Sequence, residues 1–143
     1  MKFENYMTLE FPSRSCNEAF ARSAVACFAA QLDPTVEELG DIRTAVSEAV
    51  TNCIVHGYPE KLGTITVRCR ILKGQILDIV VKDRGVGISD IEQARRPMFT
   101  TGGAERSGMG FTIMESFMTE LEISSTPGKG TTVHMRRKLQ RRK

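Results

Sequence analysis

Residues 47–57, with the sequence SEAVTNCIVHG, predict the C-terminal half of a long amphipathic helix. Apolar side chains recur at helical spacing and form one stripe, which comprises Val46, Ala49, Val50, Cys53 and Ile54. Glu48 and Asn52 stand four positions apart, so their polar ends project from one face, one turn apart. Gly57 is expected to end the helix as a C-terminal glycine. The Glu48–Asn52 pair is either a solvated outer face or part of a functional site.

Length and composition indicate one globular domain. The chain has 143 residues, of which 41% are hydrophobic and 26% charged, as in ordinary soluble domains. No apolar run is long enough for a transmembrane helix, and the first residues lack a signal peptide's apolar stretch, so we expect a cytoplasmic protein without a membrane partner. The cysteines have no metal-type spacing; three of the four are expected at buried positions, all as reduced thiols.

The net charge of +3 is concentrated at the C-terminus. Six cations gather there: Arg136, Arg137, Lys138, Arg141, Arg142 and Lys143. Without these six the rest of the chain carries a net charge of −3. A nucleic-acid-binding domain is expected to have a basic face on its folded part as well. We therefore predict a domain over residues 1–137, a solvated basic tail over 138–143, and no direct contact with nucleic acid.

The first half of the chain predicts a strand and two helices. Residues 6–11 alternate and form a strand with Met7, Leu9 and Phe11 on one face. A capping box at residues 15–18 opens a helix that ends at residues 33–34; its inward side chains are expected to be Phe20, Ala24, Phe28 and Leu32. A second capping box, at residues 35–38, opens the long helix that runs to Gly57.

The second half predicts two pairs of strands around a loop and a helix. Strands over 65–71 and 77–81 are joined by a hairpin at Lys73-Gly74. Residues 89–108 predict a long functional loop with one short helix near 91–95. A helix from Gly110 follows, with Phe111, Met114, Phe117 and Met118 expected inward, and then strands on either side of a turn at 127–130. This order predicts an α+β two-layer sandwich, with the helices on one face of a mixed, mainly antiparallel sheet.

Two glycine motifs follow the long helix. Asp83-Arg84-Gly85-Val86-Gly87 ends a buried strand, where glycines allow close approach to a flat ligand and Asp83 can accept a hydrogen bond from an exocyclic amino group such as that of adenine. An ordinary Asp-Gly turn is the alternative. Gly108-Met109-Gly110 stands at a helix start, where backbone N–H groups favour phosphate, although a glycine-rich loop exit has the same composition. Neither motif is a P-loop or a protein-kinase glycine loop.

In this order, Glu48 with Asn52, the two glycine motifs and Gly130-Thr131 resemble the Bergerat-type ATP-binding fold of gyrase, heat-shock chaperones, histidine kinases and mismatch-repair ATPases. Four runs, at residues 46–52, 56–58, 97–101 and 106–115, are similar to the anti-sigma F factor family of endospore-forming bacteria. The resemblance covers nearly the whole chain before the basic tail.

The resemblance implies a role for each motif residue. Glu48 is the expected general base, and Asn52 the expected ligand of Mg²⁺ together with the ATP phosphates. Asp83 is expected to bind adenine with help from Thr131. The remaining expected nucleotide contacts are Gly85, Gly87, Thr101, Gly108, Met109 and Gly110. Arg106 is expected to neutralise charge near the γ-phosphate, and the loop before it to act as an ATP lid.

The resemblance also implies the partners. The chain has two histidines, His56 and His134, and no room for an acceptor-histidine domain or a gyrase-type transducer, so it is expected to act in trans. The implied protein is a homodimeric serine/threonine kinase that holds an RNA polymerase sigma factor and phosphorylates an anti-anti-sigma protein, with partner contacts at Glu18, Arg22 and Thr51. A stress-response anti-sigma kinase and an ATP-binding module without phosphotransfer remain alternatives. The family often has a lysine after the Thr100-Thr101 pair, where this chain has Gly102-Gly103.

Overall fold

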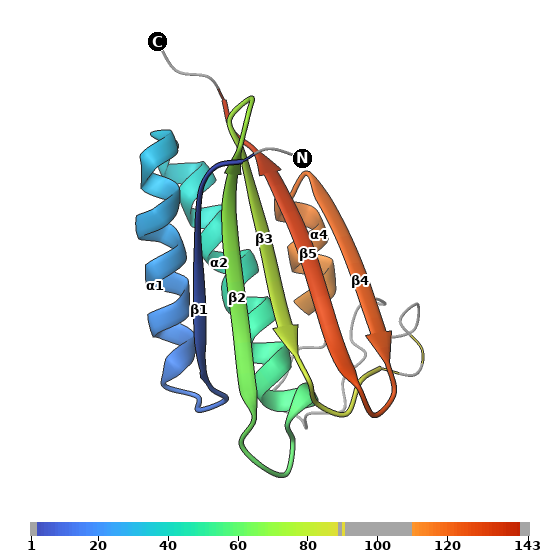
Figure 1. The fold of residues 1–143 in the computed structure, drawn as a ribbon. Coiled ribbons are helices and arrows are strands. Elements are labelled where there is room, and N and C mark those ends of the chain that lie inside the picture. Colours follow the sequence, from blue (N-terminus) through green and yellow to red (C-terminus); the bar gives the residue numbers. More distant parts are fainter. Residues whose placement is uncertain (1–2, 89, 91–109, 141–143) are drawn as a thin grey trace.

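The computed structural model describes residues 3–88, 90 and 110–140. In this part of the chain, helices cover one face of a five-stranded sheet and leave the other face open (Figure 1). The elements are β1 (Phe3–Pro12), α1 (Asn17–Ala29), α2 (Val36–Asn52), β2 (Thr64–Leu72), β3 (Ile76–Asp83), α4 (Gly110–Phe117), β4 (Glu120–Thr126) and β5 (Gly130–Lys138). The predicted α+β two-layer sandwich is confirmed.

The sheet has the strand order β1-β2-β3-β5-β4, so β5 lies between β3 and the strand that precedes it in sequence. All four pairings among the described strands are antiparallel, which corrects the predicted mixed, mainly antiparallel sheet. The register of β3 with β5 sets Asp83 opposite Thr131. Two residues that are 48 positions apart therefore meet at one end of the sheet.

The core fills the space between the helices and the inner face of the sheet. The alternation predicted for β2 and β3 is confirmed, since Ile65, Val67, Cys69, Leu77, Ile79 and Val81 are all fully buried. On α2 the predicted stripe is buried at Val46, Ala49, Val50 and Cys53, while Ile54 is half-buried. Burying an aliphatic side chain of this size contributes about 1.5–3 kcal/mol.

The face that α1 buries differs from the prediction by one residue. Its buried side chains are Ala21, Val25 and Ala29, whereas Phe20 is 54% exposed and Ala24 and Phe28 are half-buried. Small residues on the inner face allow the helix to pack closely, and Phe20 instead meets the ring of Phe11 edge-on at 6.4 Å. The predicted capping box at residues 15–18 is also wrong, because the N-cap residue is Cys16 and makes no side-chain capping bond. The inward position of Leu32 is confirmed.

The capping box of α2 is confirmed. Thr35 Oγ1 accepts from the Glu38 backbone N–H at 3.0 Å, and Glu38 Oε1 accepts from the Thr35 N–H at 2.9 Å. The end of the helix differs from the prediction: α2 stops at Asn52 and the chain continues as a π-helical turn over Cys53–Gly57. Gly57 is not left-handed, so its role is not that of a C-terminal cap.

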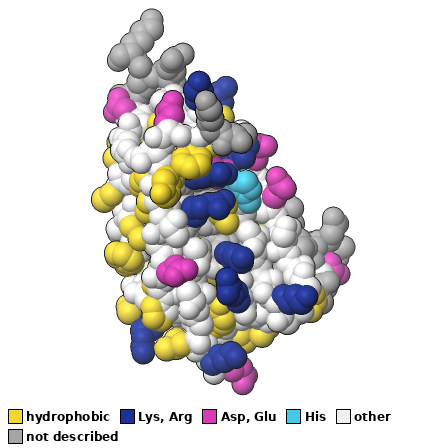
Figure 2. Space-filling view, viewed as in Figure 1, with side chains coloured by type: hydrophobic (Ala, Val, Ile, Leu, Met, Phe, Trp, Pro, Cys, Tyr) yellow, Lys and Arg dark blue, Asp and Glu magenta, His cyan; other side chains and the backbone are white. Residues whose placement is uncertain are grey.

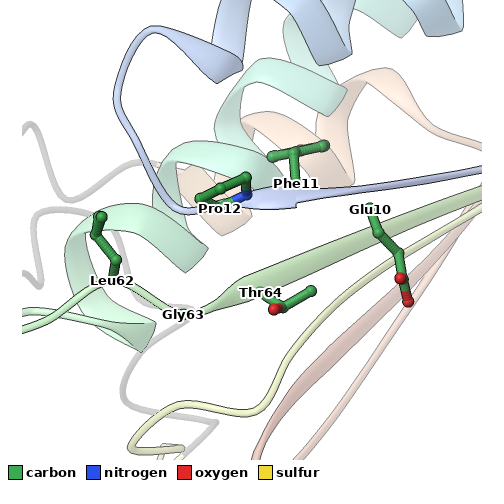
Figure 3. A pocket seen from close by; sticks show the side chains of 6 residues that line it. All are labelled: Glu10, Phe11, Pro12, Leu62, Gly63 and Thr64. Carbon is green, nitrogen blue, oxygen red and sulfur yellow. The ribbon is translucent and has the colours of Figure 1, made fainter.

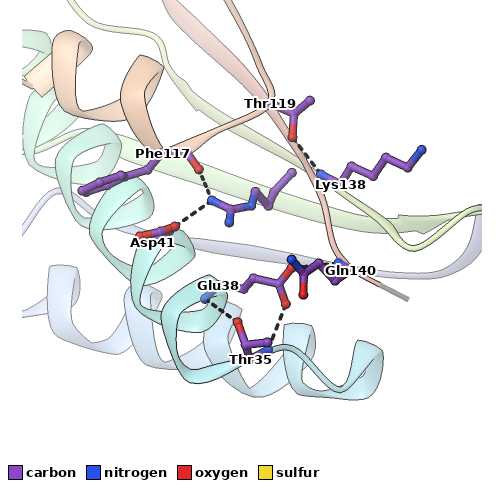
Figure 4. Close-up of polar contacts among 8 residues, drawn as sticks. Thr35, Glu38, Asp41, Phe117, Thr119, Lys138 and Gln140 are labelled. Atoms are coloured by element: carbon purple, nitrogen blue, oxygen red, sulfur yellow. Dashed lines mark hydrogen bonds and ion pairs between the residues drawn. The ribbon is translucent and has the colours of Figure 1, made fainter. Parts of the chain in front are cut away.

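The folded part of the chain extends beyond the predicted boundary at residue 137. Arg136, Arg137 and Lys138 belong to β5, and Leu139 is buried. The Gln140 N–H donates to Glu38 Oε2 at 2.8 Å (Figure 4). Alternation along β5 explains the correction, because its basic residues point in turn to the open face and to the helices. Of the four cations in the predicted tail over 138–143, Lys138 is part of the sheet.

The cysteine prediction is partly corrected. All four cysteines are free thiols, but only Cys53 and Cys69 are buried, and Cys16 and Cys27 are exposed on or beside α1. This follows from the shifted face of that helix. Within the described residues, no helix is long and apolar enough to cross a membrane.

Candidate functional site

Asp83 is the buried carboxylate at the end of β3 and is 3% exposed. Its Oδ1 accepts two backbone hydrogen bonds, from the Gly85 N–H at 2.9 Å and from the Thr131 N–H at 3.2 Å. Both predicted partners, the following glycine and the threonine of β5, are therefore in place. The two bonds fix the direction of the carboxylate before any ligand arrives.

Glycines occur around this carboxylate because the backbone segments there approach the carboxylate or one another too closely for side chains. A Cβ on Gly57 would lie 2.7 Å from Asp83 Oδ2, and a Cβ on Gly85 would lie 1.9 Å from the Gly57 carbonyl oxygen. Gly87 has φ of +78° and a Cβ there would meet Thr126. Gly57 thus ends the π-helical turn where the chain must pass directly over Asp83. This close contact, rather than a helix cap, is what requires glycine at that position.

The loop after Asp83 is tied down at both ends by hydroxyl groups. The Tyr58 hydroxyl accepts from the Arg84 N–H at 2.7 Å and donates to the Thr64 carbonyl at 2.8 Å. At the other end, Ser125 Oγ accepts from the Ile88 N–H at 2.7 Å. Sequence reasoning missed both hydroxyls, because these contacts join residues 26 and 37 positions apart and no local pattern marks them.

The groups beside Asp83 keep their protons. Burial, together with the charge of Asp83 and a hydrogen bond to it, raises the pKa of the Cys53 thiol well above its usual value. Burial likewise raises the pKa of Tyr58. A neutral thiol and a neutral phenol therefore stand next to the Asp83 carboxylate.

Glu48 and Asn52 meet the first residue of α4. A Cβ on Gly110 would lie 3.2 Å from Glu48 Oε1 and 3.3 Å from Asn52 Nδ2, so both side chains reach the helix backbone. Both are half-buried. The polar pair is not a solvated outer face: α2 directs it at the start of the helix that the second glycine motif opens. Backbone N–H groups at such a helix start favour phosphate oxygens.

The two parts of the site are joined by α2 and its π-helical turn. Glu48 and Gly57 are nine residues apart, which at the rise of a helix is about 13 Å. Asp83, which can accept a hydrogen bond from a nucleobase, lies near one end of this segment. The start of α4, which is suited to bind phosphate, lies near the other end. π-helical turns are rare and often mark functional sites.

Four predicted nucleotide contacts lie outside the described residues: Thr101, Arg106, Gly108 and Met109. The same holds for the predicted lid over residues 89–108, except for Asp90. Of the predicted partner contacts, Arg22 Nε lies 3.4 Å from Glu18 Oε2 on α1, and Thr51 is half-buried on α2. Glu18 and Arg22 thus adjoin one another on one helix, and Thr51 belongs to a different one.

The donor set fits a magnesium ion held mainly by its substrate. Within residues 3–88, 90 and 110–140 there is no group of three His, Cys, Asp or Glu side chains that could hold a metal. Asn52 offers one carboxamide oxygen beside the start of α4. Mg²⁺ keeps several waters and is commonly bound through one or two protein oxygens plus phosphates, which agrees with this arrangement.

An open pocket lies elsewhere, between the end of β1 and the start of β2 (Figure 3). Its walls are formed by Glu10, Phe11, Pro12, Leu62, Gly63 and Thr64. None of the predicted site residues lines it, so it is not the site described above.

The sheet, the α2 pair and the Asp83 loop define a nucleotide-binding domain of the histidine kinase-like ATPase type. The family model described as "Histidine kinase-like ATPase domain" matches residues 11–137. Within that class the chain belongs to the anti-sigma F factor family, as the predicted resemblance implied.

Curated relatives cover almost the whole chain. The anti-sigma F factor of Thermoanaerobacter sp. (strain X514) is 60% identical over 136 residues, which are 94% of each chain. That of Pasteuria penetrans is 56% identical over 95% of this chain and 92% of its own. That of Geobacillus kaustophilus is 52% identical over 97% and 96%.

Solved structures show the same fold at lower identity. The RsbU and RsbW domains of Rv1364c from Mycobacterium tuberculosis superpose with a TM-score of 0.72 at 20% identity, over 97% of this chain and 34% of that one. The histidine kinase domain of the Erythrobacter litoralis EL346 blue-light activated histidine kinase gives 0.59 at 22% identity, over 85% and 60%.

Proposed function

We propose that this chain is an ATP-dependent protein serine/threonine kinase that also binds and inhibits a sporulation sigma factor of the sigma F type. The observation that carries the proposal is the convergence of Glu48 and Asn52 on Gly110, with Asp83 held at the far end of the same helical segment. The same helical segment thus carries the general base Glu48 and the metal ligand Asn52, and its far end lies beside Asp83, the hydrogen-bond acceptor for adenine.

Asp83 and Thr131 bind the adenine. The carboxylate accepts a hydrogen bond from the 6-amino group, and the close contact of Gly57 with Asp83 keeps the carboxylate in place. The backbone N–H groups at the start of α4, near Gly110, bind the phosphates, where the helix dipole favours negative charge.

Asn52 holds Mg²⁺ through its carboxamide oxygen, together with the phosphates. When bound there, the ion would offset the charge of the phosphate oxygens. Arg106, outside the described residues, adds positive charge at the same group.

Glu48 acts as the general base. Its carboxylate takes the proton from the acceptor hydroxyl, the freed oxygen forms a bond to the γ-phosphorus, and the bond from that phosphorus to the β–γ bridging oxygen breaks. The products are a phosphoserine on the protein substrate, ADP, and a protonated Glu48 that returns its proton to water.

The sigma factor and the anti-anti-sigma protein bind the kinase in turn. With ATP bound, a homodimer in the cytoplasm holds the sigma factor through α1, where Glu18 and Arg22 lie, and Thr51 adds a partner contact on α2. The unphosphorylated anti-anti-sigma protein displaces the sigma factor, becomes phosphorylated, and leaves the kinase with ADP.

The direct test is phosphotransfer. The purified protein is incubated with γ-labelled ATP, Mg²⁺ and the candidate anti-anti-sigma protein, with Glu48→Gln as the parallel sample. Label on a serine of the partner with the wild type, and none with Glu48→Gln, supports the kinase. ATP binding without labelling of any partner would reduce the protein to a sequestering module.

Sigma binding is tested separately. A pull-down of the sigma factor is run with ATP and with ADP, using wild type, Arg22→Ala and the control Arg43→Ala, an exposed arginine of α2. We expect Arg22→Ala to lose capture in ATP while keeping kinase activity, and Arg43→Ala to behave as wild type. Full capture by Arg22→Ala would move the sigma surface away from α1.

A further inference from the structure

Ser125 lies opposite Thr131 in the pairing of β4 with β5. Directly opposed residues point to the same face of a sheet, and the two hydroxyl oxygens are 2.8 Å apart. Neither β4 nor Ser125 belongs to any of the motifs that point to nucleotide binding. The serine nevertheless touches the hydroxyl of the threonine that lies beside Asp83.

The hydrogen bonds of Ser125 account for every site on its oxygen. A hydroxyl has one proton and two lone pairs. Ser125 donates its proton to the Gly130 carbonyl at 3.0 Å, and it accepts from the Ile88 N–H at 2.7 Å. One lone pair remains, and it faces Thr131 Oγ1. By distance alone either hydroxyl could donate in the 2.8 Å contact between them. With the Ser125 proton on the buried Gly130 carbonyl, which can only accept, Thr131 is the donor.

This assignment fixes what Thr131 can offer a ligand. Its only hydroxyl proton is directed at Ser125, so toward any base it presents lone pairs. Its backbone N–H is directed at Asp83 Oδ1 at 3.2 Å, and the carboxylate is itself an acceptor without a proton. The side chains of these two residues, at the end of β3 and β5, thus offer a base acceptors and no donor.

We infer that Ser125 is a positioning residue that sets purine selectivity: by taking the Thr131 proton it makes Thr131 an acceptor, so that the site binds a 6-amino purine nucleotide and rejects a 6-oxo purine nucleotide. The inference rests on the proposed adenine site. A 6-amino group donates to acceptors of this kind. A 6-oxo group places its own lone pairs against them, and a site built for hydrogen bonding rejects such an analogue strongly.

The test compares ATP with inosine 5′-triphosphate, which carries a 6-oxo group in place of the amino group. Dissociation constants for both are measured by calorimetry on wild type, Ser125→Ala and Ser124→Ala. Ser124 is the exposed neighbour on the same strand and points to the opposite face. Because the readout is a ratio within one protein, a general loss of stability cancels.

We expect the wild type and Ser124→Ala to prefer ATP equally, and Ser125→Ala to lose about tenfold of that preference, the size of one hydrogen bond to a partner of the wrong polarity. The freed Thr131 hydroxyl can then donate to the 6-oxo group. Thr131→Val, which keeps the shape and removes the hydroxyl, should lose a similar part of the preference. The double variant should be no worse than Thr131→Val alone, because Ser125 acts through Thr131.

The outcomes separate this inference from the proposed function. If the wild type prefers ATP and Ser125→Ala keeps the full preference, Ser125 does not set selectivity, and the adenine site stands. If the losses in the two single variants add in the double variant, Ser125 does not act through Thr131. If the wild type binds both nucleotides equally, the adenine site at Asp83 is overturned and this inference with it.

Discussion

Glu48 is one of two polar side chains that α2 directs at the start of α4. A Cβ on Gly110 would lie 3.2 Å from its carboxylate, so the group stands where a transferred phosphoryl group would be bound. Glu48→Gln keeps the shape of the side chain and removes its ability to take a proton. We expect phosphotransfer to fall by about 10²–10⁴-fold, the usual contribution of a general base, with ATP affinity within about threefold of wild type. Labelled transfer to the partner and calorimetry measure the two effects.

A glutamate elsewhere on the same helix controls for the loss of charge. Glu37 is exposed in the first turn of α2, and Glu37→Gln should transfer phosphate at the wild-type rate. Equal, normal rates in both variants would remove Glu48 from the role of base.

The key residues differ in how far sequence could predict them. Glu48, Asn52 and Asp83 were marked as candidates by short local patterns, a helical spacing or an aspartate followed by glycines at a strand end, and their expected roles came from the family resemblance. Tyr58 and Ser125 could not, because their hydroxyls act on backbone groups that only the fold brings near. A buried tyrosine or a serine in an edge strand has the same appearance in sequence whether or not it ties down a loop.

Among the elements, α2 matters most, because with its π-helical turn it connects Glu48 and Asn52 to the loop around Asp83. Replacing either of two glycines of this helical segment by alanine is expected to change the free energy of unfolding in opposite directions. Gly40 lies mid-helix, and a Cβ added there would have nothing within 4 Å. Gly40→Ala therefore lowers the backbone entropy of the unfolded chain without creating a clash in the folded one. We expect it to raise the free energy of unfolding by about 0.5–1 kcal/mol and to leave ATP binding unchanged. Urea denaturation measures the free energy of unfolding, and calorimetry measures ATP binding.

Gly57→Ala adds the same methyl group where there is no space for it. The new carbon would lie 2.7 Å from Asp83 Oδ2 and 2.8 Å from its Cγ, so the carboxylate must move. We expect ATP affinity to fall at least tenfold, and stability to fall by about 1–3 kcal/mol, as for an overpacked core. ATP binding at wild-type strength by a folded Gly57→Ala protein would show that the position of Asp83 is not critical.

Element boundaries show where local patterns reach their limit. The capping box of α2 is a contact between neighbours in sequence, and it is confirmed. The inner face of α1 was predicted one residue off because large side chains were expected inward, whereas close helix packing buries Ala21 and Ala29. The end of β5 was mistaken for a tail because the cations near the C-terminus suggest solvent, although Lys138 belongs to β5 and Leu139 is buried.

At the scale of the whole molecule, the face of the sheet opposite the helices carries a second buried carboxylate. Figure 2 shows this face, with Lys and Arg side chains running down its middle. Beneath them Asp78 of β3 has no exposed surface and bonds to Arg70 at 3.1 Å, to Arg136 at 2.7 Å and to His134 at 2.5 Å. These contacts join β2, β3 and β5, so one side chain holds three strands together on the side that no described helix covers.

The hydrogen bonds to Asp78 predict how the free energy of unfolding depends on pH. Burial alone would raise the pKa of Asp78, but hydrogen bonds from His134, Arg136 and Arg70 lower it overall below its usual value of 3.8. A carboxyl group whose pKa is lower in the folded state stabilises the fold above its unfolded pKa, and the stabilisation disappears as pH falls through the folded pKa. The pKa of Glu38 is lowered as well: burial opposes the change, and backbone N–H groups of Thr35 and Gln140 outweigh it. We therefore expect the free energy of unfolding to begin to fall below about pH 4, near the unfolded pKa of these groups.

Asp78→Asn isolates the contribution of the open face. The amide cannot balance the surrounding cations, and breaking a buried ion pair on one side costs about 3–5 kcal/mol, so we expect a loss near the lower end of that range at pH 7. The acid slope should also become shallower, because one of the groups that must be protonated is gone. Urea denaturation between pH 3 and pH 7 measures both, with Glu60→Gln, an exposed glutamate after α2 and its π-helical turn, as the control that changes neither. If Asp78→Asn kept the full acid slope, the carboxylates that govern acid unfolding would lie elsewhere, and the cluster would stabilise the sheet without making it sensitive to pH.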